Sequence, residues 1–410
     1  MPPVDPKALL EHITALQPQL VAHPKELVQQ ESPSEDPAAV NAAMALVEKY
    51  ARTIGGRPKY YRQKGYGDVL ELRFGPTKFI PYRSDRRSVP RPILLLGHLD
   101  TVWPIGTLAK MPWKQSAGKI SGPGTLDMKA GVIMALTAIE ALKAMKINRR
   151  IILLLNSEEE IGSPISRPIT QRLARKSSAV LVLEPAQGLA LKTARKGVGR
   201  YLVEVTGVGA HSGVDFEAGH SANLEISRLI QKISSFTDLS RGLTFNPGVI
   251  AGGTHSNVVA SHAQVEVDVR IARASDARDV ESLFRRLKPT DPYCKIKVSG
   301  GINRPPMERK PRIVRLFKQA QKLAAELGFP LEEAATGGGS DGNFTAAIGV
   351  PTLDGLGAIG ASAHAAHEHI LTKHLIPRTA LLAAMLADIN QTPTRGPKKR
   401  RGARSSSAAV

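Results

Sequence analysis

The sequence predicts an α/β protein that carries a smaller α+β domain inserted into its fold. Short apolar strands alternate with helices over residues 93–183, which is typical of an open α/β sheet. Over residues 196–303 the order becomes β-α-β-β-α-β, the ferredoxin-like arrangement. The α/β pattern then resumes, and 410 residues are enough for two or more domains. We therefore expect one discontinuous domain, 1–195 and 304–393, interrupted by a second at 196–303.

The chain begins with helices. Apolar residues at helical spacing predict three of them, over residues 7–16, 24–30 and 37–54. Asp36 suits the N-cap of the third, with Pro37 at its first position and Gly55 near its end. Two strands should follow, at 59–63 and 69–74.

The remaining elements follow from the same two periodicities. In the α/β region we expect strands 93–96, 151–155 and 179–183 with helices 128–145 and 165–175. In the inserted domain we expect strands 201–208, 244–251, 264–273 and 295–299 with helices 222–236 and 276–287. Asp276 is placed to cap the last of these helices. The chain should close with helix 313–327, strand 351–356 and helix 374–389.

Composition limits the class of protein. Cys294 is the only cysteine, so no disulfide can form within the chain and a zinc site must use histidines and carboxylates. Neither an 18-residue apolar run nor a signal peptide is seen, which predicts a cytoplasmic protein without membrane insertion. The net charge is +20, part of it in a tail at 394–410 that we expect to be disordered. The core shows no nucleic-acid motif, so no specific nucleic-acid partner is expected.

Polar residues gather where the predicted strands end. His98 and Asp100 directly follow strand 93–96, and the carboxyl ends of strands are where open α/β sheets bind ligands. Asp127 follows a Gly-rich turn just before a long helix. Alone it would be read as an N-cap, although a carboxylate has two oxygens and can bridge two cations.

A second group of polar residues supports the first. Glu158, Glu159 and Glu160 follow strand 151–155, and Glu184 follows strand 179–183. Adjacent carboxylates at a strand end either begin a helix or are compensated by cations, because uncompensated their pKa values would rise. A histidine-rich segment, His364 to His369, comes late in the chain. Each signal is weak alone, but together they indicate a metal site.

The motifs, taken in order, resemble the M20 family of metallopeptidases and, within it, the carboxypeptidase G2-like glutamate carboxypeptidases. They are GHLDTVWP (97–104), GPGTLDMKAG (122–131), SEEEIGS (157–163), Glu184-Pro185 and AHAAHEHI (363–370). The resemblance covers nearly the whole chain from about residue 31. It implies a zinc-peptidase-like α/β catalytic domain with an inserted ferredoxin-like dimerisation domain that acts as a lid.

The resemblance also implies the roles of the site residues. His98 and Glu184 would bind one zinc, Glu160 and His364 the other, and Asp127 both. Glu159 would be the general base and acid, and Asp100 would support His98 from behind. Counting back from Gly162-Ser163 sets this register for the glutamates. His364 is favoured over His367 because it lies four residues before Glu368. The cofactor would be two Zn²⁺, with Co²⁺ or Mn²⁺ as replacements in vitro.

The implied reaction is amide hydrolysis in a homodimer. His211, in a Gly-Ala-His-Ser-Gly motif, would stabilise the oxyanion in the neighbouring subunit's site. The positions expected to bind substrate are Asn257, Arg270, Arg304, Gly339 and Ser340. Arginine and Gly-rich turns suit carboxylates, which favours release of a C-terminal glutamate or other acidic residue from a peptide, N-acyl or folate-like substrate. The alternative is an N-acyl-amino-acid deacylase of the acetylornithine deacetylase or succinyl-diaminopimelate desuccinylase type.

Overall fold

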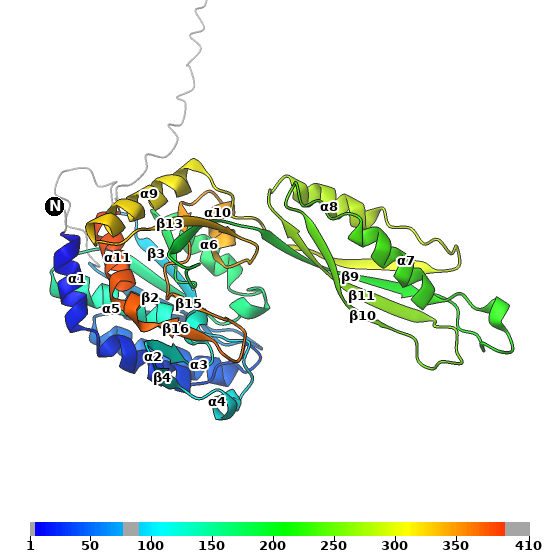
Figure 1. The fold of residues 1–410 in the computed structure, drawn as a ribbon, viewed down its shortest axis with the longest axis horizontal. Helices are drawn as coiled ribbons and strands as arrows, with labels where there is room; N and C mark the ends of the chain where they lie inside the picture. The colour runs from blue at the N-terminus through cyan, green and yellow to red at the C-terminus, as the bar shows by residue number, and fades with distance from the viewer. Residues whose placement is uncertain (1–4, 77–89, 390–410) are drawn as a thin grey trace, which may run out of the picture.

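The computed structural model describes residues 5–76 and 90–389, and the predicted basic tail lies outside them. Figure 1 shows a rounded α/β body and a long arm beside it, which carries its own sheet. The arm is the inserted domain, here called the lid. The predicted fold class is confirmed, while the residue boundaries of the domains stay predictions.

The body is built on a six-stranded sheet in the order β1-β2-β6-β3-β7-β14. Its strands are β1 (Arg57–Tyr61), β2 (Val69–Phe74), β3 (Ile93–His98), β6 (Ile151–Asn156), β7 (Val180–Val182) and β14 (Thr352–Leu353). The four strands from β6 to β14 run parallel, and β2 runs antiparallel to both of its neighbours, β6 and β1. The carboxyl ends of β3, β6 and β7 therefore meet at one edge.

Helices cover both faces of this sheet. One face packs on α1 (Pro6–Ala15), α2 (Gln19–Gln29), α3 (Pro37–Thr53), α5 (Ala130–Ala144), α9 (Pro311–Glu326) and α11 (Leu375–Asp388). The other packs on α6 (Arg167–Lys176), with α10 (Gly342–Ala347) next to it. Successive residues of β3 separate accordingly, since Leu95 joins the first cluster and Leu94 and Leu96 the second. Burial on both faces explains why the parallel strands read as continuous apolar runs.

Most predicted helix ends hold to within a few residues. Asp36 caps α3 as predicted, because its carboxylate accepts the N–H groups of Ala38 and Ala39 at 3.0 Å. By contrast, α2 begins at Gln19, so Pro24 lies inside it rather than at its start. Asp276 was wrongly expected to be an N-cap. Ser275 holds that position, and the Asp276 carboxylate instead accepts from Arg241 at 2.6 Å.

Several short elements were not predicted. A small sheet joins β4 (Lys114–Ser116), β5 (Lys119–Ser121), β15 (Gly360–Ala361) and β16 (His369–Leu371), and a parallel pair joins β8 (Ala190–Arg195) to β13 (Glu332–Thr336). A four-residue helix, α4 (Thr107–Lys110), lies before β4. Because β16 pairs with β5, the late histidine segment is brought beside the Gly-rich turn that follows β5.

The lid is an antiparallel sheet with two helices on one face. Its order is β10-β11-β9-β12, from β9 (Gly197–Thr206), β10 (Thr244–Gly252), β11 (His262–Ile271) and β12 (Lys295–Arg304). Helices α7 (Ala222–Ser234) and α8 (Asp276–Arg285) bury a separate apolar core against it. In the part of the chain that is described, no helix is long and apolar enough to span a membrane.

Candidate metal centre and substrate cavity

Three side chains meet at the carboxyl edge of the main sheet. His98, the last residue of β3, has its Nε2 atom 3.2 Å from Asp127 Oδ1 and 3.7 Å from Glu184 Oε1. Glu184 follows β7, and Asp127 lies in the turn before α5. One nitrogen and two carboxylate oxygens within 4.8 Å of one another can hold a metal ion.

A second group shares Asp127. His364 Nε2 lies 3.4 Å from Asp127 Oδ2 and 3.1 Å from Glu160 Oε2, so the two oxygens of Asp127 face different histidines. His364 has a positive φ of 63° in the loop between β15 and β16. The structure therefore brings together all five predicted ligands. His367 belongs to neither group of described residues.

The carboxylates here are crowded and buried. Burial, together with the neighbouring Asp127 carboxylate, raises the pKa of Glu184 to about 7. Burial also raises the pKa of Glu160, and it raises that of Glu159 well above its usual value. Buried carboxylates that repel one another in this way favour a site that is compensated by cations.

Asp100 connects the two strand ends. Its backbone carbonyl lies 3.0 Å from His98 Nδ1, whereas its carboxylate Oδ1 lies 3.4 Å away. The same carboxylate accepts the backbone N–H groups of Glu159 and Glu160, each at 3.1 Å. Asp100 is fully buried, so it orients the histidine mainly through its carbonyl and the two glutamates through its carboxylate.

Two further carboxylates shape the loops. Glu158 turns away from the site, where its carboxylate accepts from the backbone of Ser157, Ile165 and Ser166. Glu368 accepts from three backbone N–H groups of the Gly-rich turn, the shortest being that of Leu126 at 2.7 Å. In the sequence analysis Glu368 was used only to choose His364 over His367. The structure shows that it holds the turn that carries Asp127.

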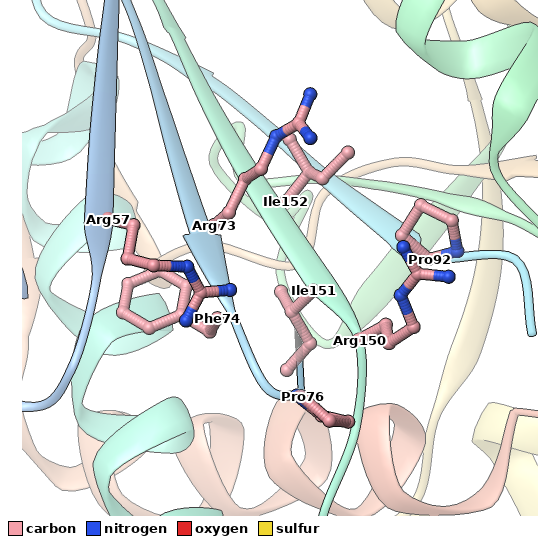
Figure 2. A pocket seen from close by; sticks show the side chains of 8 residues that line it. All are labelled: Arg57, Arg73, Phe74, Pro76, Pro92, Arg150, Ile151 and Ile152. Carbon is pink, nitrogen blue, oxygen red and sulfur yellow. The ribbon is translucent and has the colours of Figure 1, made fainter. Parts of the chain in front are cut away.

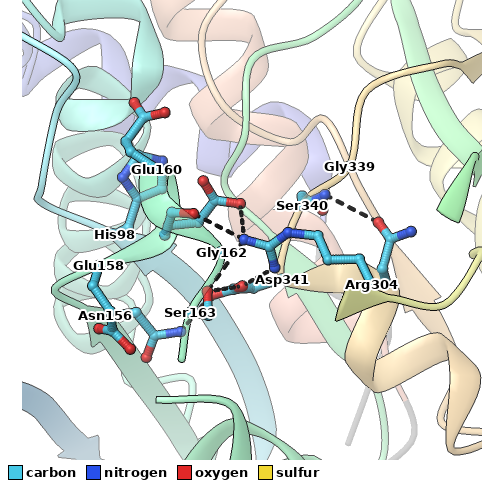
Figure 3. Close-up of polar contacts among 12 residues, drawn as sticks. His98, Asn156, Glu158, Glu160, Gly162, Ser163, Arg304, Gly339, Ser340 and Asp341 are labelled. Atoms are coloured by element: carbon cyan, nitrogen blue, oxygen red, sulfur yellow. Dashed lines mark hydrogen bonds and ion pairs between the residues drawn. The ribbon is translucent and has the colours of Figure 1, made fainter. Parts of the chain in front are cut away.

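Arg304 lies between two carboxylates (Figure 3). Its Nη2 atom donates to Glu159 Oε1 at 2.9 Å and its Nη1 atom donates to Asp341 Oδ1. Asp341 also accepts from Ser163 and Asn156. Arg304 was predicted to bind substrate, yet in this arrangement its guanidinium is buried and holds the predicted base.

A cavity of about 570 Å³ opens between the body and the lid. The body lines it with Glu159 and with four of the five predicted ligands, all but the buried His98, and the lid lines it with Val198, Arg200, Asp268 and Arg270. Both Nε and Nη2 of Arg270 donate to the Asp268 carboxylate, at 2.7 and 2.9 Å.

Gly339 lines this cavity but Ser340 does not. Ser340 is fully buried, and its hydroxyl donates to Asp354 at 2.6 Å. The buried Arg195 links Asp354 to the Gly-rich turn. It forms a two-point contact with the Asp354 carboxylate and donates to the Gly338 and Gly339 carbonyls. The sequence analysis missed Arg195, because its strand β8, with the sequence ALKTAR, was itself not predicted.

His211 and Asn257 lie far from this cavity. Both are exposed in the loops at the outer end of the lid, where Ser212 N–H donates to the Asn257 carbonyl at 3.0 Å. Neither lines the cavity of its own subunit. The structure therefore brings these two predicted residues together, but does not bring them to the metal-facing residues.

A second hollow, of about 270 Å³, lies at the opposite edge of the main sheet (Figure 2). It surrounds the beginning of β6, and Arg57, Arg73 and Arg150 line it. No histidine or carboxylate is among its described lining residues. Both groups of predicted ligands instead lie at the cavity between body and lid.

Two histidine–carboxylate groups that share an aspartate, next to a buried glutamate, define the class as a metal-dependent hydrolase. The chain belongs to peptidase family M20/M25/M40, whose model matches residues 94–388. It is thus a metallopeptidase of this family.

Individual relatives agree with this assignment. The chain is 29% identical over 389 residues to carboxypeptidase G2 of Pseudomonas sp. (strain RS-16), covering 92% of this chain and 91% of the relative. It is 30% identical over 307 residues to a probable carboxypeptidase of Ajellomyces capsulatus, covering 68% and 66%.

Solved structures share the fold. The aminopeptidase PepT of Bacillus cereus matches with a TM-score of 0.72 at 23% identity, over 90% of this chain and 98% of that one. An M20 family metallo-carboxypeptidase of Sulfolobus solfataricus matches with a TM-score of 0.68 at 16% identity, with the same coverage.

Proposed function

We propose that this protein is a di-zinc carboxypeptidase that releases a C-terminal acidic amino acid, glutamate above all, from a peptide, N-acyl or folate-like substrate. The observation that carries the two-metal part is the sharing of Asp127, since its two oxygens face two separate ligand groups. Each group offers a histidine nitrogen and carboxylate oxygens, a donor set that zinc accepts. His98, Asp127 and Glu184 would hold one ion, and Asp127, Glu160 and His364 the other.

The residues around the ions have distinct tasks. When bound, zinc would acidify a water and polarise the substrate carbonyl. Glu159 would take the proton of the attacking water and return it to the leaving amine, because it lines the cavity and is not one of the ligands. Asp100 and Arg304 would keep Glu159 in place through its backbone and its carboxylate.

The acidic specificity rests on the charge of the cavity. Three arginines, Arg200, Arg270 and Arg304, line the same cavity as four of the predicted ligands. Arginine binds carboxylate at two points, which suits an acidic leaving residue. The name carboxypeptidase among the relatives supports release of a C-terminal residue, and the preference for an acidic one rests on these arginines.

A homodimer through the lid is part of the proposal. Strand β10 is an edge of the lid sheet, and Val249 and Ile250 on it are 58% and 60% exposed. An apolar sheet edge of this kind favours pairing with another chain. In such a dimer His211, remote from its own cavity, would be available to the partner's site. A cytoplasmic location stays a prediction.

Hydrolysis by the zinc-loaded protein tests the proposal. The panel would contain N-benzoyl-, N-acetyl-, N-succinyl- and folyl-amino acids, with Glu159→Ala as the control. Release of glutamate from the folyl or benzoyl compound, lost in the variant, is the expected result. Preference for an acetyl or succinyl substrate would instead assign a deacylase, and inactivity at full zinc occupancy would contradict both.

A further inference from the structure

Three arginines line the cavity between body and lid: Arg200, Arg270 and Arg304. Two of them are engaged by the protein itself. Arg304 is buried between Glu159 and Asp341, and Arg270 makes a two-point contact with Asp268 and donates to the Gly337 carbonyl at 3.3 Å. A substrate anion would have to compete for either of these guanidinium groups.

Arg200 differs from the other two. Its guanidinium makes no ion pair or hydrogen bond with any residue that the structure describes, and its side chain is exposed on the wall of the cavity. The nearest carboxylate on the adjacent strand is that of Asp268, its register partner, which is already bound by Arg270. Arg200 is therefore a cavity cation whose charge is uncompensated.

The position of Arg200 suits a ligand that extends from the metal-facing residues. Val198, two residues earlier on the same face of β9, is paired with Arg304 and lies against Gly339. Arg200 is thus roughly 7 Å further out along the strand, at about 3.3 Å per residue. Its partner on β12 is Gly301, where an added Cβ would meet nothing within 4 Å, so no side chain fills the space over that neighbouring residue.

We propose that Arg200 binds a carboxylate of the substrate's leaving amino acid and thereby selects an acidic residue at that position. The proposal rests on the proposed amide hydrolase function and adds the residue that sets its specificity. It also explains how the cavity can recognise two carboxylates, since the backbone of the Gly-rich turn at Gly338 and Gly339 remains for the other one. A substrate whose leaving amino acid has a neutral side chain of equal size would still reach Arg200, but would offer its guanidinium no carboxylate.

The test compares N-benzoylglutamate with N-benzoylglutamine, which has the same shape without the charge. Arg200→Gln should lower kcat/KM for the glutamate compound about 10- to 100-fold, the worth of one charge-assisted contact, through a higher KM. The glutamine compound should be little affected, and Arg200→Lys should retain part of the preference. The matched control is Arg286→Gln, an equal loss of charge at the exposed end of α8 on the other face of the lid sheet. Equal losses on both compounds, or none, would overturn the proposal.

A binding measurement separates this proposal from the proposed function. In the zinc-loaded Glu159→Ala protein, calorimetry would give the dissociation constants of the same two compounds with and without Arg200→Gln. Selective weakening of the glutamate compound supports the Arg200 subsite even if the wild-type protein hydrolyses neither. Equal affinities in the presence and absence of Arg200, or no binding of the glutamate compound at all, would contradict the subsite whatever the enzyme hydrolyses.

Discussion

Arg304 Nη2 lies 2.9 Å from Glu159 Oε1, and this contact joins the last residue of β12, where the chain returns from the lid, to the predicted base in the body. On its other side the same guanidinium pairs with Asp341, and all three side chains are largely buried. The lid is therefore fastened to the body at the catalytic residue. Any movement of the lid relative to the body must either keep the contact between Arg304 and Glu159 or release Glu159.

Arg304→Ala is expected to destabilise the protein by about 3–5 kcal/mol, because it leaves buried carboxylates without their cation. The free energy of unfolding in urea measures this. Arg309→Ala is the matched control, since Arg309 is mostly exposed where it pairs with Glu333. Its removal should barely change the unfolding free energy. Similar losses for the two variants would mean that the buried network has no special weight.

Glu159→Ala should lower kcat by about 10²- to 10⁴-fold while bound zinc is retained, because the residue moves protons and is not a ligand. Glu160→Ala should lose zinc as well as activity. Metal analysis of both purified variants beside their kinetics makes the comparison. Loss of zinc from Glu159→Ala with full zinc in Glu160→Ala would show that the register of the three glutamates is shifted by one.

Asp127→Ala should weaken both metal positions, whereas His98→Ala should weaken only one. The physical reason is that Asp127 belongs to both ligand groups and His98 to a single one. Titration of the metal-free proteins with zinc gives the number of tight sites in each. Two tight sites surviving in Asp127→Ala would rule out a shared carboxylate.

The strands and the ligands that follow them could be predicted because local pattern and topology agree. Leu94 to Leu96 is apolar on both faces, so it reads as a buried strand, and His98 must then lie at its carboxyl end. Glu184 is placed by the same argument. Parallel neighbours bring these ends together without any long-range information beyond the β-α-β alternation.

Other features depend on contacts that no local pattern contains. His364 is positioned by β15 and β16, of two and three residues, which are too short to show a periodicity. The engagement of Arg304 by Glu159 joins residues 145 positions apart. Arg200 alternates on its strand as any solvated residue would, and only the cavity reveals what it faces. Residue type alone suggested that Ser340 was free to bind substrate, whereas its hydroxyl is bonded to Asp354 within the protein.

Complementation between inactive variants tests whether His211 serves the partner's site. His211→Ala and Glu159→Ala should each be nearly inactive alone. Co-expressed, half of the dimers would be mixed, and each mixed dimer would hold one site with an intact Glu159 and the partner's intact His211. Activity should therefore recover to about a quarter of the wild-type value, as expected for random pairing in a two-fold dimer. Co-expression of Glu159→Ala with the double variant Glu159→Ala/His211→Ala offers no intact site and should stay inactive. No recovery in the first mixture, from dimers shown to be mixed, would place the action of His211 within its own subunit and would require the lid to fold over much further than it does here.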